Sequence, residues 1–121
     1  MSLETFLQDR TKVRPFSAGE QIVIEGDQAH EAYMVRDGFV TVFRHREGKD
    51  SILARLGPGS VFGEMALLSY DRYTLSVRAE TAGELYVIPI ELLVEQIRQT
   101  PPLIRSILDM LLDRVNETNE A

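Results

Sequence analysis

The chain has 121 residues, which suits one domain with its own hydrophobic core, and it contains no cysteine, which excludes a disulfide framework, a thiolate metal site and an iron–sulfur cluster. Its formal net charge is −6, from 19 acidic and 13 basic residues, so it lacks the basic face that nucleic-acid binders need, and we expect no nucleic-acid contact. No apolar run approaches the roughly 20 residues of a membrane-spanning helix, and we therefore expect a cytoplasmic protein that enters no membrane.

A short helix is predicted over residues 3–10. Ser2 suits the position that caps its first turn, and Glu4 places a carboxylate near the positive end of the helix dipole. Pro15 then prevents the helix from continuing, because its ring removes a backbone donor and clashes with the preceding turn.

Residues 16–90 consist of short strand-like runs separated by turn signals. Asp37-Gly38 is a strong hairpin pair because both residue types tolerate a positive φ angle. Residues 47–50 and 57–60 give two further turns. Many short strands at near-regular spacing, with no helices alternating between them, predict a mainly β fold of the antiparallel jelly-roll type.

After residue 90 the apolar spacing becomes that of helices. One helix is expected before the Pro101-Pro102 pair, and a second from about Leu103 to Asn116. The second helix carries one apolar stripe, made of Ile104, Ile107, Leu108, Leu111, Leu112 and Val115. Four of these residues have the 4-3-4 spacing of a left-handed coiled coil: Ile104, Leu108, Leu111 and Val115. We therefore expect a homodimer through this helix; the alternative is that the stripe packs on the chain's own barrel.

The segment GSVFGEMALLS, residues 59–69, has the pattern of a short helix that follows a glycine. Backbone N–H groups left unpaired at such a helix start, together with the helix dipole, favour an anion beside Gly63. Glu64 would repel a bound phosphate unless it has a task of its own, such as accepting hydrogen bonds from a sugar hydroxyl. The simpler alternative is that Gly63 makes a tight turn and Glu64 caps the helix.

The order of F-SAGE-QIVIEGD, AYMVRDG-FVTV, LGPGS-VFGEMALL and SVRA, over about residues 13–116, resembles the cyclic nucleotide-binding domain family. The resemblance implies an eight-stranded jelly roll with flanking helices and a short helix in the phosphate cassette, residues 62–79. It implies that the backbone amides of Gly63, Met65 and Ala66 hold a cyclic phosphate and that Glu64 holds the ribose 2′-hydroxyl. The expected ligand-binding residues are Phe62, Gly63, Glu64, Met65, Ala66, Arg72, Tyr73 and Thr74.

The sequence departs from the family pattern at the residue that should neutralise the phosphate. Family members usually read Pro-Arg-(Ala/Ser)-Ala shortly before VRA, whereas this chain has Arg72, Tyr73, Thr74 and Leu75. Strand alternation puts Tyr73 on the inward face with Leu75, and Arg72 on the outward face, unless a bulge absorbs one residue. We therefore expect cAMP and cGMP to bind weakly or not at all.

Two functions follow from these observations. The first is a regulatory module, a single domain over residues 1–121 with its β-roll at about 13–90 and its C-terminal helices at about 90–117, which senses a cyclic nucleotide or another small-molecule effector. The second is a degenerate, non-binding module that serves as a dimerisation or protein-interaction scaffold. Whether the chain is complete or cut from a longer regulator, channel or enzyme stays open.

Enzyme chemistry has little support in the sequence. A metal-dependent cupin needs clustered histidine ligands, and this chain has only His30 and His45, in separate turn regions. A haem sensor would lack axial ligands for the same reason, and no nucleophile triad or carboxylate pair stands out. We expect no enzyme activity, no metal and no cofactor, with cAMP or cGMP as a ligand at most.

Overall fold

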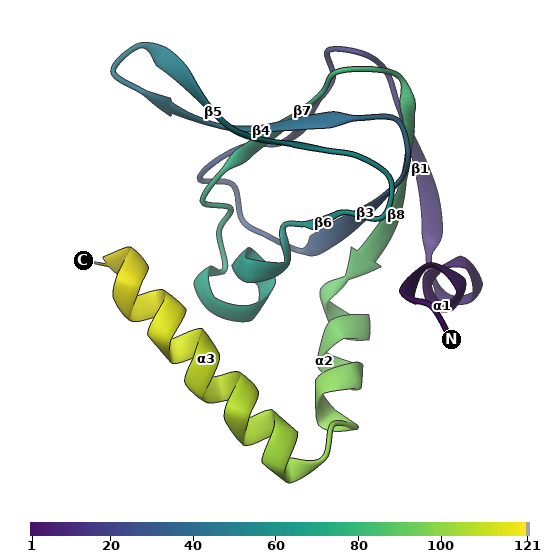
Figure 1. Cartoon of the computed structure of the whole chain (residues 1–121), viewed down its shortest axis with the longest axis vertical. Helices are drawn as coiled ribbons and strands as arrows, with labels where there is room; N and C mark the ends of the chain where they lie inside the picture. The colour runs from purple at the N-terminus through teal and green to yellow at the C-terminus, as the bar shows by residue number, and fades with distance from the viewer. Residues whose placement is uncertain (121) are drawn as a thin grey trace.

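The computed structural model describes the backbone of residues 1–120 and the side chains of residues 1–68 and 71–114. Within these residues, two four-stranded antiparallel sheets lie face to face (Figure 1). The first sheet has the order β1 (Lys12–Phe16), β8 (Gly83–Pro89), β3 (Glu31–Asp37) and β6 (Val61–Phe62). The second has the order β2 (Gln21–Val23), β7 (Ser76–Ala79), β4 (Val40–Arg46) and β5 (Lys49–Leu56). The mainly β jelly roll expected from the sequence is confirmed.

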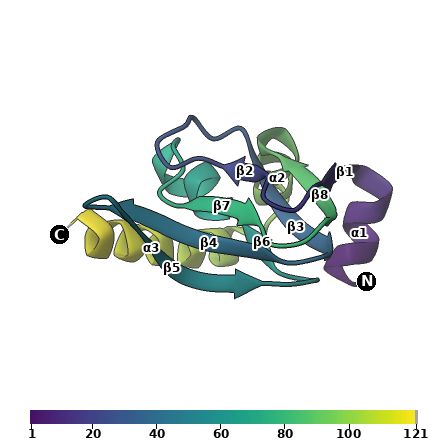
Figure 2. The same cartoon turned by 90° about the horizontal axis from the view of Figure 1, so that it is seen from above.

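Helix α1 (Leu3–Arg10) has the bounds that its sequence predicts. The Oγ atom of Ser2 accepts a hydrogen bond from the backbone N–H of Thr5 at 3.1 Å, so the N-cap forms as expected. In the middle of the helix, Leu7 is buried against Met34 and Tyr86 of the first sheet. Helix α1 therefore covers the outer face of that sheet (Figure 2).

Helices α2 (Ile90–Arg98) and α3 (Pro102–Glu120) diverge from a short connection at the far end of the molecule (Figure 1). Helix α3 begins at a proline, which costs nothing in the first turn because the N–H group there has no intrahelical partner. It continues four residues past the expected end at Asn116. It packs against η1 (Ala66–Tyr70), the short helix of the cassette.

The main core lies between the two sheets. Its centre is formed by Val35, Val40 and Leu85, whose side chains are fully buried. Strand β3 is buried on both faces, because Tyr33 and Val35 point between the sheets while their neighbours pack under the helices. A strand buried on both faces reads as one apolar run rather than an alternating one, as AYMV does here.

Two of the predicted turns differ in backbone geometry from each other. At the Asp37-Gly38 turn only Gly38 has a positive φ angle, +88°. At the β4–β5 hairpin Glu47 and Gly48 both do, at 54° and 77°. The two-residue hairpin geometry thus forms at the tip of the β4–β5 hairpin, whereas the hairpin predicted at Asp37-Gly38 is wrong, because β3 and β4 lie in different sheets.

Candidate functional site

A cavity of about 200 Å³ lies between the sheets, at the end closed by η1. Its walls come from the two sheets, from the cassette and from the segment before β7. The lining residues are Val23, Val42, Leu56, Val61, Phe62, Gly63, Glu64, Met65, Ala66, Tyr73, Thr74, Leu75 and Val77. Seven of the eight predicted ligand-binding residues are among them, and the eighth, Arg72, is not.

Gly63 forms the bend between β6 and the cassette helix. Its φ angle of +84° favours glycine, and a Cβ atom added there would lie 3.3 Å from the ring of Tyr73. The helix then runs from Glu64 into a π-helical turn and ends at Asp71, which has a left-handed backbone with φ of 62°. The short cassette helix that the sequence predicts is therefore present, with a wider final turn than expected.

Tyr73 points into the cavity. Its ring packs against core residues of both sheets, and its hydroxyl donates a hydrogen bond to the backbone carbonyl oxygen of Glu31 at 2.5 Å. Its backbone N–H donates to the carbonyl of Asp27 at 3.0 Å, and its carbonyl accepts from the N–H of Gly26 at 2.8 Å. Burial raises the pKa of Tyr73, so the phenol is a neutral donor at physiological pH.

Arg72 points the other way. Its Nη1 atom donates to the backbone carbonyl oxygen of Gly26 at 2.9 Å, on the exposed side of the segment. Residue 72 pairs with Gln28 in an isolated bridge. The orientation predicted from strand alternation is the one that the structure has.

The cavity contains one charged residue among those that line it, Glu64, and no lysine or arginine. The carboxylate of Glu64 has no hydrogen-bond or ion-pair partner within the described part of the chain. Such a site offers a bound ligand one anionic acceptor and several backbone amides, with apolar surface around them. It can bind a sugar hydroxyl directly, but it does not neutralise a phosphate with a side-chain cation.

Sequence reasoning missed the residues behind Tyr73. The hydroxyl of Tyr33 donates to a carboxylate oxygen of Glu31 at 2.5 Å, and its ring stacks on Phe62 with 5.3 Å between centroids. Burial and the nearby carboxylate both raise the pKa of Tyr33, which keeps this phenol protonated as well. Only the inward parity of Tyr33 with Val35 could have indicated its place, since its partner Phe62 is distant in sequence.

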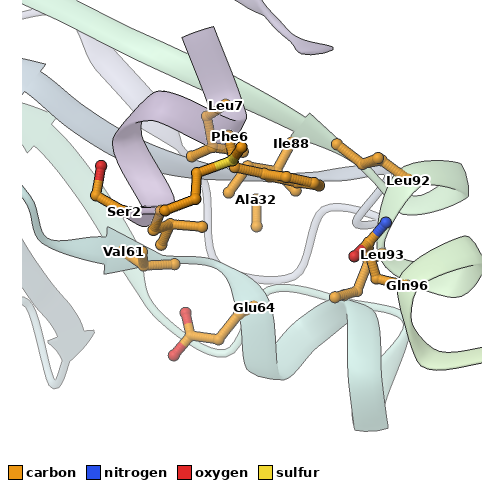
Figure 3. A pocket seen from close by; sticks show the side chains of 12 residues that line it. Ser2, Phe6, Leu7, Ala32, Val61, Glu64, Ile88, Leu92, Leu93 and Gln96 are labelled. Atoms are coloured by element: carbon orange, nitrogen blue, oxygen red, sulfur yellow. The ribbon is translucent and has the colours of Figure 1, made fainter. Parts of the chain in front are cut away.

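A second, larger cavity of about 490 Å³ opens between α1 and α2, on the other side of Glu64 (Figure 3). Apolar side chains from both helices and from the first sheet line most of it: Leu3, Phe6, Leu7, Ala32, Val61, Ile88, Leu92 and Leu93. Figure 3 shows the carboxylate of Glu64 turned away from these apolar groups. Val61 and Glu64 therefore border both cavities.

Neither histidine is among the residues that line the two cavities. His30 is exposed, and the Nδ1 atom of His45 lies 2.8 Å from a carboxylate oxygen of Asp50 on the β4–β5 hairpin. No group of three or more histidine, aspartate or glutamate side chains among the described residues could hold a metal ion. No helix among the described residues has the length and apolar content needed to cross a membrane.

Comparisons with known proteins agree on one family. The profile of the cyclic nucleotide-binding domain matches residues 13–100. The chain is 34% identical over 107 residues to the cyclic AMP receptor protein of Thermus thermophilus, covering 88% of this chain and 50% of the relative. It is 30% identical over 112 residues to human potassium/sodium hyperpolarization-activated cyclic nucleotide-gated channel 2, covering 93% of this chain and 12% of the channel.

Solved structures give the same result. The catabolite activator protein of Thermus thermophilus superposes with a TM-score of 0.76 at 30% identity, covering 98% of this chain and 57% of that one. The EAL enzyme Bd1971 in its cAMP-bound form superposes with a TM-score of 0.80 at 26% identity, covering 89% of this chain and 29% of that one. The chain thus spans half or less of the length of the two sequence relatives, and it matches 29% of the EAL enzyme.

Proposed function

Because the chain belongs to the cyclic nucleotide-binding domain family, we propose that it is a regulatory ligand-sensing module whose altered cassette weakens the binding of cAMP and cGMP. The observation that carries this proposal is the inward position of Tyr73, together with the outward position of Arg72. The cavity is lined by seven of the eight predicted ligand-binding residues but has no side-chain cation in its lining. The module acts as one domain over residues 1–121, and the same chemistry suits another small, polar effector.

Six of the predicted ligand-binding residues have a part in the proposed binding mode. The backbone amides of Gly63, Met65 and Ala66 receive the phosphate, and Glu64 receives the ribose hydroxyl. The remaining two members of the set, Phe62 and Thr74, line the space for the rest of the ligand. The free carboxylate of Glu64 supports this assignment, since a buried or half-buried acceptor without a partner is ready to bind a hydroxyl donor.

Energetics favour weak binding. A charge-assisted hydrogen bond to a phosphate contributes about 1.5–3 kcal/mol, which corresponds to about tenfold to a hundredfold in affinity. Tyr73 offers one neutral donor instead, and that donor already binds Glu31. The cavity volume of about 200 Å³ also falls below the roughly 300–1,000 Å³ that is ordinary for small-molecule sites.

A second function, a non-binding scaffold that dimerises, is favoured by the surface of α3. Ile104, Ile107 and Leu111 are 54%, 45% and 51% exposed, and they lie along one side of the helix. Leu108, which the sequence places in the same seam, is half-buried, and the side chain of Val115 lies outside the described residues. A second copy of α3 would bury the exposed stripe, and neither function requires enzyme activity or a location outside the cytoplasm.

Titration calorimetry with cAMP and cGMP tests the first function directly. Dissociation constants in the millimolar range support an altered sensor, and affinities of micromolar or better contradict the proposed effect of Tyr73. If neither the native chain nor a variant with the family's cassette residues gives a binding heat at any accessible concentration, the non-binding scaffold is the better description of this chain.

A further inference from the structure

The larger cavity, of about 490 Å³ between α1 and α2, has no part in the proposed function. Side chains of α1, of α2 and of the first sheet surround it on three sides (Figure 3). The sheet contributes Ala32 of β3 and Ile88 of β8, which are direct cross-strand partners. The volume lies within the roughly 300–1,000 Å³ that is ordinary for small-molecule sites, so the space suits a compact ligand.

The cavity lies where two apolar clusters meet. In one cluster, Leu92 of α2 packs beside the buried Leu7 of α1. In the other, Leu93 of α2 packs against small residues of β3 and η1. Ile88 packs against both clusters, yet apolar surface at the cavity stays open to solvent, since Leu3 is 49% exposed. Covering this surface with an apolar ligand is favourable.

Three side chains of the lining are polar: Ser2, Glu64 and Gln96. The Oγ atom of Ser2 already caps α1. The side-chain amide of Gln96 makes no hydrogen bond within the described residues, and it offers both a donor and an acceptor. Figure 3 shows this amide on the α2 side of the cavity, beside Leu93. Gln96 can therefore bind one hydroxyl or carbonyl group of a ligand.

The charge of the lining discriminates between ligands of equal length. Among the side chains that line the cavity, Glu64 is the one charged group, and no lysine, arginine or histidine is present. A carboxylate ligand would lose its hydration here without gaining a cation, which is unfavourable. An ammonium ligand would need the carboxylate of Glu64, which Figure 3 shows turned away from the apolar groups. A neutral ligand meets neither problem.

We propose that the cavity between α1 and α2 binds a neutral, mainly aliphatic small molecule whose single hydroxyl or carbonyl group is hydrogen-bonded by Gln96. The site needs no nucleotide and does not depend on the proposed function. It differs in chemistry from the cavity between the sheets, which offers backbone amides and the carboxylate of Glu64 to a polar ligand.

Titration calorimetry of the native chain with octanol tests the proposal, with octanoate as the matched anion at about pH 7.5, where octanoic acid is ionised. We expect saturable binding of octanol and about tenfold weaker binding of octanoate. Each methylene group buried in the cavity should raise the affinity about fourfold, so hexanol should bind about fifteenfold more weakly than octanol. The absence of saturable octanol binding, or equal affinities for octanol and octanoate, would overturn the proposal.

A lysine at the rim should change the preference of the site. Gln96→Lys places a cation in the lining and should raise the affinity for octanoate about tenfold above that of the native chain. Gln99→Lys is the matched control, because Gln99 is an exposed residue at the end of α2 that does not line this cavity. An equal rise in both variants would mean that octanoate responds to the net charge of the chain, and the proposed site would be wrong.

Filling the cavity gives a second comparison. Leu92→Trp adds a ring inside the lining and should weaken octanol binding at least about tenfold, whereas Val94→Trp, on the exposed side of α2, should leave it unchanged. Equal octanol affinities in two variants that both melt cooperatively would contradict the proposal. If Leu92→Trp does not fold, the lysine pair decides. If octanol does not bind and light scattering shows that only Leu92→Trp breaks an assembly, a second copy covers the cavity instead of a small molecule.

Discussion

The hydroxyl of Tyr73 donates a hydrogen bond to the backbone carbonyl oxygen of Glu31, with 2.5 Å between the two oxygens. This bond joins the segment before β7 to the first residue of β3, across the entrance of the cassette. It engages the one side-chain donor that stands where family members have an arginine. A phosphate that entered the site would have to displace either this bond or the ring itself.

Restoring the cassette should restore ligand binding. Three substitutions are combined. Tyr73→Arg supplies the missing positive charge, Arg72→Pro restores the family's residue before it, and Leu75→Ala opens space for the ligand. A ligand that binds only the folded state stabilises it by about 2.7 kcal/mol at a hundredfold excess over its dissociation constant. With millimolar cAMP, the melting temperature of the variant should rise by several degrees, while that of the native chain changes little. A large shift in the native chain would contradict the proposed role of Tyr73.

Glu64 should be required for nucleotide binding in any chain that binds. Glu64→Ala removes the acceptor for the ribose hydroxyl and should cost about 1–3 kcal/mol of binding free energy. The comparison is best made by calorimetry in the restored variant, with Glu91→Ala, an exposed glutamate on α2, as the control. Equal affinities for Glu64→Ala and the control would mean that the ligand adopts a different pose.

The exposed stripe of α3 should support a homodimer. Placing a charge at its centre, by Ile107→Glu or Leu111→Glu, should disfavour association because an interface excludes unpaired charge. Light scattering at high micromolar concentration should give a dimer for the native chain and a monomer for either variant. Ser106→Glu adds the same charge at another exposed position of the helix and should remain dimeric. A native chain that is monomeric at that concentration contradicts the prediction.

Gly83, the first residue of β8, should tolerate no side chain. A Cβ atom there would lie 2.1 Å from the carbonyl oxygen of Asp37 and 2.5 Å from the ring of Phe16. Because the first of these atoms belongs to the backbone of a paired strand, Gly83→Ala should destabilise the fold by about 2–4 kcal/mol in urea denaturation. Gly57→Ala meets only the ring of Phe39, which can turn away, and should cost clearly less.

Acid should weaken the fold partly through Glu80. Hydrogen bonds from Arg55, at 2.6 Å, and from Thr41, at 2.7 Å, lower the pKa of this carboxylate below its usual value. The lowered pKa stabilises the folded chain above the unfolded-state value of about 4.3, and this contribution disappears as the pH falls through the folded-state value. Glu80→Gln should therefore show a flatter loss of stability between about pH 5 and 3 in urea titrations. If the stability of Glu80→Gln and that of the native chain fell with pH along parallel profiles, the prediction for Glu80 would be wrong.

Local chemistry explains what the sequence could predict. The bounds of α1 follow from its cap and first turn, and the inward position of Tyr73 follows from an alternation that the pairing with Gly26 and Asp27 preserves. Both features depend only on residues that are close in the sequence or on the pairing of a single strand. The mainly β class follows in the same way from the spacing of turns.

Contacts between distant segments explain what could not be predicted. The partner of Tyr73, Glu31, is 42 residues away, and no pattern in either segment indicates the bond. The π-helical turn of the cassette closes on Asp71, whose left-handed backbone is uncommon outside glycine. On α3, Leu108 is half-buried while Ile107 and Leu111 are exposed, so packing divides an apolar stripe that spacing alone treats as a single seam.

Glu64 and Val61 line both cavities, and the chain contains no cysteine to interfere with labelling. A thiol introduced by Gln96→Cys, at the rim of the larger cavity, would therefore be the sole attachment point for an environment-sensitive fluorophore. Its emission would respond when a ligand repositions Glu64, without the label occupying the ligand's own space. The two cavities thus offer separate places for a reporter and for a ligand, joined by two shared residues.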